Sequence, residues 1–197
     1  MWKKLGLTAL ASGLLLLSGC GKASTPTINE SMTQVMSPQT QTIWDISSRA
    51  FNDKGDGLVA EKISPTDWIR LAKAGRALRD RARLLAEAPH VTVAAPGELI
   101  LGQDAAHEGV KHTWDAASPK QVQALIDANP ALFRQHLNAL ADAGDSILKA
   151  AHRKDIKTVY AVSSEFDETC DGCHQPFWGT DEPPPVPKGY IPILKGK

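Results

Sequence analysis

Apolar residues recur along most of this chain at steps of three and four, the spacing of a helix that buries one face. Four long segments share this pattern and are predicted to be helices: residues 28–51, 65–88, 130–154 and 155–174. No segment alternates apolar and polar residues convincingly, as a half-buried strand does. The pattern therefore predicts an all-α fold, an antiparallel four-helix bundle with an insertion between the second and third long helices.

Residues typical of helix ends support these boundaries. Thr27 followed by Glu30 has the form of a capping box, and Ser64 can cap the second helix. Pro38 interrupts the first helix, and we expect a kink there or a restart with Ser37 as the new cap. The second helix has the apolar spacing of a bundle seam, formed by Trp68, Leu71, Gly75, Leu78, Ala82 and Leu85.

Two segments lack a long helical period. Residues 89–117 contain proline, glycine and three histidines, and we expect an extended loop or insertion with some local structure. Ser118 and Pro119 then begin a short helix that runs to about Ala128. The proline-rich residues 179–197 are expected to form an extended strap or to be disordered.

The first residues have the features of an export signal rather than of a folded domain. Two lysines precede a mostly apolar run over residues 5–17, which is shorter than the roughly 20 residues that a membrane-spanning helix needs. A Leu-Ser-Gly-Cys sequence follows, ends at Cys20 and resembles a bacterial lipobox. This resemblance implies removal of residues 1–19, attachment of diacylglycerol to the Cys20 sulfur, and a lipid-anchored tether over residues 20–27. A plain signal peptide with an incidental cysteine is the alternative.

Composition and charge change this picture little. The chain has 22 Lys and Arg against 22 Asp and Glu, and this balance gives no sign of nucleic-acid binding. Export places the chain in an oxidising compartment, where an odd count of three cysteines is unusual. The odd count is explained if Cys20 is lipidated and if Cys170 and Cys173 serve as a pair in one site.

The strongest chemical signal is a Cys-x-x-Cys-His sequence formed by Cys170, Cys173 and His174, the attachment pattern of c-type haem. Two thiols three residues apart on a helical turn can each add to one vinyl group of the porphyrin, and the next histidine then faces the iron from the same side. The cysteine pair could instead be a thiol–disulfide redox pair or half of a zinc site. However, the chain lacks both a second cysteine pair and the βαβ scaffold of thioredoxin-like sites. We therefore predict one covalent haem c.

A helical bundle with this motif near its C-terminus is similar to the cytochrome c′ group, the class II cytochromes c. The resemblance spans about residues 30–178, while residues 89–128 and the proline-rich tail depart from it. It rests on the haem motif followed by Phe177-Trp178, on residues 32–38 leading to Trp44, and on residues 64–68. The resemblance implies a monohaem four-helix bundle over residues 28–178.

The same resemblance implies how the other side of the iron is covered. In this family the first helix lies over the distal haem face, where low-spin members supply a methionine and high-spin members an apolar residue. Met32, twelve residues before Trp44, matches the family position of the ligand, and Met36 is the alternative. A methionine pair at helical spacing can also be ordinary core.

Histidines are the rival ligands. Bis-histidine ligation through His107 or His112 stays open, if the insertion folds over the haem. Each histidine outside the motif is nevertheless expected to be exposed or packed rather than a ligand: His90, His107, His112, His136 and His152.

These observations predict an electron carrier and not an enzyme, since no nucleophile–base pair or glycine-rich phosphate loop is evident. An iron with two protein ligands passes single electrons, and histidine–methionine ligation raises its reduction potential. The alternative is a five-coordinate haem protein that binds nitric oxide or carbon monoxide. Expected partners are redox proteins of the membrane or periplasm and, by analogy with the family, a second copy packed through the first two helices. The expected location is the periplasm-facing side of a bacterial membrane.

Overall fold

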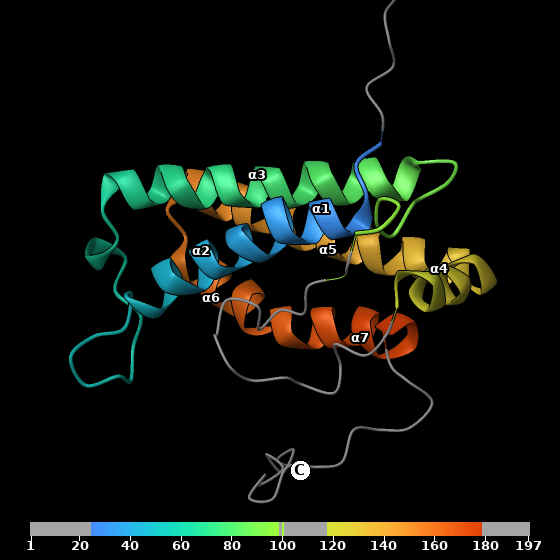
Figure 1. Ribbon diagram of the computed structural model, residues 1–197. Helices are drawn as coiled ribbons and strands as arrows, with labels where there is room; N and C mark the ends of the chain where they lie inside the picture. The colour runs from blue at the N-terminus through green and yellow to red at the C-terminus, as the bar shows by residue number, and fades with distance from the viewer. Residues whose placement is uncertain (1–24, 99, 101–117, 179–197) are drawn as a thin grey trace, which may run out of the picture.

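The computed structural model describes residues 25–98, 100 and 118–178, and its secondary structure is almost entirely helical (Figure 1). The elements in chain order are α1 (Ile28–Ser31), the π-helical turn η1 (Met32–Met36), α2 (Ser37–Ser48), the 3-10 turn η2 (Ala60–Lys62), α3 (Pro65–Glu87), α4 (Pro119–Ala128), α5 (Pro130–Arg153), α6 (Ile156–Ser164) and α7 (Phe166–Trp178). The described residues form no strand, only an isolated bridge between Phe51 and Leu58. The prediction of an all-α fold is confirmed.

Several predicted features fall outside the described residues: the signal segment 1–19, the lipidated Cys20, His107, His112 and the tail 179–197. Within the described part of the chain, no helix is both long and apolar enough to cross a membrane.

Capping by short polar side chains determines where most of these helices begin. Thr27 Oγ1 accepts a hydrogen bond from the Glu30 N–H at 3.0 Å, and Glu30 Oε2 accepts one from the Thr27 N–H at 2.7 Å. Ser64 Oγ accepts the Asp67 N–H at the start of α3, and Ser118 with Gln121 forms the same reciprocal box before α4. These three helix starts agree with the sequence because each is made by residues within one turn.

Of the two outcomes predicted at Pro38, the restart of the helix is wrong, and the helix also ends earlier than predicted. Ser37 has helical backbone angles and makes no side-chain cap, so the helix does not restart there. Instead, the turn before the proline widens to a π-helix, closed by the Ser37 N–H bonding the Met32 carbonyl. Pro38 supplies no N–H and its ring crowds the preceding turn, which is a known cause of such distortions. The helix then ends at Ser48 rather than at residue 51.

The fourth predicted helix, residues 155–174, is two helices with a break at Glu165. The Glu165 N–H bonds the Val162 carbonyl, which tightens the last turn of α6. The Ser163 carbonyl meanwhile accepts Trp44 Nε1 at 2.8 Å, a partner on α2. The sequence prediction missed this break because the contact is made across the fold. α7 also continues past the predicted end at residue 174, through Pro176, and ends at Trp178.

α3 and α5 form the most extensive helix–helix contact among the described residues, while α2 packs on α3, and α6 packs on α2 and α5. Successive long helical segments run in opposite directions, with α3 at the upper edge of Figure 1 and α6 and α7 at the lower edge. Every residue of the predicted α3 seam is buried. Where α3 crosses α5, Gly75 and Gly144 bring the two backbones together, because a Cβ on either glycine would lie within 2.7 Å of the other helix.

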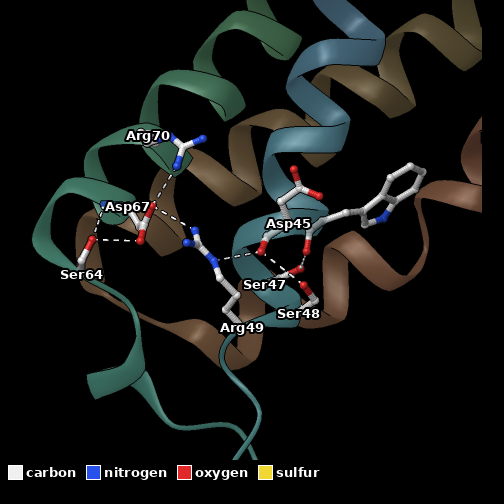
Figure 2. A network of polar contacts seen from close by, with 8 residues as sticks. Asp45, Ser47, Ser48, Arg49, Ser64, Asp67 and Arg70 are labelled. Carbon is white, nitrogen blue, oxygen red and sulfur yellow. Dashed lines mark hydrogen bonds and ion pairs between the residues drawn. The ribbon is translucent and has the colours of Figure 1, made fainter. Parts of the chain in front are cut away.

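An ionic network ties the end of α2 to the start of α3 (Figure 2). Arg49 Nη2 and Arg70 Nη1 both donate to Asp67 Oδ1, at 3.0 and 3.1 Å, and the Ser64 hydroxyl donates to Oδ2 at 2.9 Å. Burial by itself raises the pKa of Asp67, but these hydrogen bonds outweigh it and hold the pKa below its ordinary value of 3.8. The carboxylate therefore stabilises the junction in its charged form.

We expect Asp67→Asn to lower the free energy of unfolding by about 2 kcal/mol at pH 7, since three hydrogen bonds to a charged group are weakened. Because the folded pKa is depressed, this stabilisation is present above about pH 4 and is lost as the pH falls through the folded pKa. Urea denaturation at pH 7 and at pH 3 measures the difference, which shrinks at the lower pH. The exposed Asp142→Asn on α5 is the control. An Asp67→Asn loss that is independent of pH contradicts the ionic role.

Candidate functional site

The Cys-x-x-Cys-His motif lies on one stripe of α7 that faces the protein interior. Phe166, Cys170, Cys173 and Phe177 follow each other at steps of four, three and four, which is the spacing of one helix face. Phe166 is fully buried and Phe177 is 3% exposed, so both ends of the stripe are fixed in the core. The two cysteines between them are free thiols and are only partly exposed. The aromatic anchors therefore orient both thiols toward the same space.

That space is an apolar cavity between α7, α5 and the first helix. Cys170, Cys173 and His174 line it from α7, together with Thr169. Most of the remaining wall is aliphatic or aromatic and comes from α3, α4 and α5 as well as α1. The lining suits a largely apolar ligand that also binds thiols and an imidazole.

Burial sets the protonation of the motif. It raises the pKa of the Cys170 thiol to about 11, with help from Asp167 and Asp171. It raises the pKa of the Cys173 thiol to about 12, with help from Cys170. A thiol–disulfide redox pair needs a lowered thiol pKa, so this environment is the opposite of what such a pair requires.

Burial also lowers the pKa of His174, partly opposed by the Asp171 carboxylate. The imidazole is therefore neutral near pH 7, which is the form that ligates a metal.

Met32 and Met36 line the same cavity from the first helix. Met36 is 3% exposed, whereas Met32 is partly exposed, and the two occupy the first and last positions of the π-helical turn. π-helical turns inside α-helices are frequent at functional sites. The structure thus brings together five residues selected from the sequence: Met32, Met36, Cys170, Cys173 and His174.

His136 also lines the cavity, close to the motif, and the sequence did not predict this position. It was expected to be exposed or packed, and it is packed: the ring lies edge-on to Phe177, with centroids 6.3 Å apart, and its Cε1 is 3.5 Å from the Cβ position of Gly172. The sequence did contain a signal for this position. His136 lies three residues after Phe133 and four before Leu140, which places it on the same helix face as these two residues of the cavity wall.

The described parts of the insertion also contribute to the site. Val122 and Ile126 of α4 line the cavity. The Thr92 and Val93 carbonyls accept the Ile28 and Asn29 N–H groups, both at 2.9 Å, and hold the start of α1 in place. The sequence did not predict that residues 122 and 126 of the insertion form part of the cavity wall, and this role follows from the fold.

In comparisons with protein-family models, curated proteins and solved structures, nothing matches this chain. Among the described residues, no three His, Cys, Asp or Glu side chains are grouped as they would be around a metal ion. A haem iron takes only one or two protein ligands, so that observation does not bear on the motif.

Proposed function

We propose that this chain is a monohaem c-type cytochrome, a lipid-anchored one-electron carrier facing the bacterial periplasm. One observation carries the proposal: a single apolar cavity is lined by Cys170, Cys173 and His174 on one side and by two methionines on the other. These groups come from opposite ends of the chain. A thiol pair alone would have several explanations, whereas this combination matches the needs of covalent haem.

The donor set fits haem c. Cys170 and Cys173 would hold the macrocycle through two thioether bonds, and the neutral imidazole of His174 would bind the iron. Met32 would supply the sixth ligand, with Met36 as the alternative. Bound there, haem c supplies an iron that alternates between ferric and ferrous states. The residues around it exclude water and lower the local dielectric, which disfavours the more highly charged ferric form.

The helix packing supports a four-helix bundle of the class II type. The first unit is α1 with η1 and α2, the second is α3, the third is α5, and the fourth is α6 with α7. α3 packs on α5 and α2, and the fourth unit packs on α2 and α5. The insertion adds α4 at the haem end, as a departure from the simple four-helix plan.

Expression of the full chain in a bacterium with a cytochrome c maturation system tests the proposal. We expect a red mature protein whose mass includes one covalent haem, with a low-spin ferrous spectrum that carbon monoxide leaves unchanged. A colourless protein with the mass of the polypeptide alone would reject haem attachment. A high-spin spectrum that shifts with carbon monoxide would keep the haem and assign gas binding instead of electron transfer.

The distal ligand is tested by Met32→Ala and Met36→Ala in the same host. We expect Met32→Ala to abolish the low-spin spectrum, admit carbon monoxide and lower the reduction potential, because a soft axial ligand is lost. Met36→Ala serves as its matched control and keeps the low-spin spectrum. The reverse result would name Met36, and a low-spin spectrum in both variants would rule out methionine ligation.

A further inference from the structure

The outer face of α3 is a basic stripe. This helix holds six Lys and Arg against three Asp and Glu, a net charge of +3, whereas α7 holds three acidic residues and no Lys or Arg, a net charge of −3. The exposed residues of α3 that we call the α3 basic stripe are Ile69, Arg70, Lys73, Arg76, Arg83 and Leu84. Charge is thus divided between two opposite edges of the molecule, since α3 and α7 lie at the upper and lower edges of Figure 1.

Most of this positive charge is not neutralised within the described residues. Lys73, Arg76 and Arg83 form no ion pair within the part of the chain that the structure describes. Asp80 is an exposed acidic residue between Arg76 and Arg83, and it forms an ion pair with Arg79 at 2.8 Å. The other exposed acidic residue, Glu87, lies at the end of the helix.

Two large apolar side chains interrupt the basic ones. Ile69 is 56% exposed and Leu84 is 47% exposed, the two highest values among the large hydrophobic residues that the structure describes. Basic residues mixed with exposed apolar ones are typical of a helix face that lies on an anionic membrane surface, where cations meet the headgroups and apolar groups enter the interface.

The chain enters the fold on the same side. Thr25–Thr27 lead into α1 beside the C-terminal half of α3 (Figure 1). Ser31 of α1 is tied to that half of α3, since Arg81 Nη1 donates to its hydroxyl at 3.2 Å. Cys20 lies five residues before Thr25, and five residues span at most about 18 Å when fully extended. A lipid on Cys20 would therefore keep this side of the molecule close to the bilayer.

We propose that the α3 basic stripe docks on anionic lipid headgroups, and that α7 with its haem motif consequently faces away from the membrane. This orientation rests on the proposed lipid anchor at Cys20. It leaves the acidic side of α7 accessible to a redox partner. A second copy of the chain fits the stripe poorly, because a two-fold dimer through α3 places like charges opposite each other.

Vesicle sedimentation tests the docking with the full mature chain carrying Cys20→Ser, so that acyl chains do not dominate binding. Vesicles of phosphatidylcholine are compared with vesicles that also contain phosphatidylglycerol. We expect binding only to the anionic vesicles, weakening as salt is added. The triple variant Lys73→Glu/Arg76→Glu/Arg83→Glu should bind about 100-fold more weakly, since each cation at such a surface strengthens binding about fivefold.

The matched control reverses three exposed lysines on other elements, as Lys54→Glu/Lys120→Glu/Lys157→Glu. Its net charge is identical to that of the α3 variant, and we expect at most a few-fold loss. An equal loss in both variants, or no vesicle binding by the parent chain, overturns the proposal. Binding to polyglutamate but not to vesicles would also overturn it and assign an acidic protein to the stripe.

Vesicle sedimentation does not require haem, so its result is independent of whether the chain is a cytochrome. A colourless chain that binds anionic vesicles through α3 would reject the cytochrome proposal and support the docking surface. A haem-loaded chain that does not bind these vesicles would support the cytochrome proposal and reject the docking surface.

Discussion

Cys170→Ala/Cys173→Ala is expected to eliminate covalent haem completely. Both thiols line the cavity from one face of α7, and no other cysteine lies among the described residues. Without them His174 would hold haem only by a coordinate bond, which denaturation breaks. Intact-mass spectrometry and haem staining after denaturing electrophoresis measure the loss.

Cys20→Ser is the matched control for the double variant, because it also replaces a cysteine by a small residue, but outside the motif. We expect it to retain a full complement of haem and to lose only membrane attachment. Haem that stays covalently bound to the double variant would refute attachment through α7. Loss of haem in Cys20→Ser would point to a failure of export or maturation instead.

Gly144→Ala is expected to destabilise the fold by about 3 kcal/mol, at the upper end of typical overpacking costs. The new Cβ would lie 2.7 Å from both the Arg79 amide nitrogen and the Gly75 carbonyl oxygen. Both contacts are backbone atoms of α3, which cannot rotate aside as a side chain can. The two helices must separate, and fully buried residues beside the crossing, such as Leu78 and Ile147, lose contacts. Urea denaturation measures the change.

The exposed Asp142→Ala on the same helix is the control, and its effect should stay within about 0.5 kcal/mol. A loss below about 1 kcal/mol in Gly144→Ala would mean that α3 and α5 can move apart easily. The close crossing at the two glycines would then not be a requirement of the fold.

The sequence by itself determined the features that depend on neighbouring residues. The starts of α1, α3 and α4 could be predicted because each cap is formed within a single turn. The same holds for the grouping of Cys170, Cys173 and His174, because their spacing on one helix places all three along the same cavity. Helical periodicity likewise identified the buried seam of α3, because one face of a helix must be covered.

Only the tertiary structure decided features that depend on residues far apart in the chain. The break at Glu165 accompanies a bond between the Ser163 carbonyl and Trp44 of α2, which no local pattern encodes. The entry of His136 into the cavity required α5 to pack on α7. The same is true of both methionines: helical spacing puts Met32 and Met36 on one face, but only the tertiary fold brings that face to the cavity that Cys170, Cys173 and His174 line. Capping bonds and helix periods arise within a turn or two, whereas a site assembled from distant segments exists only once the core has formed.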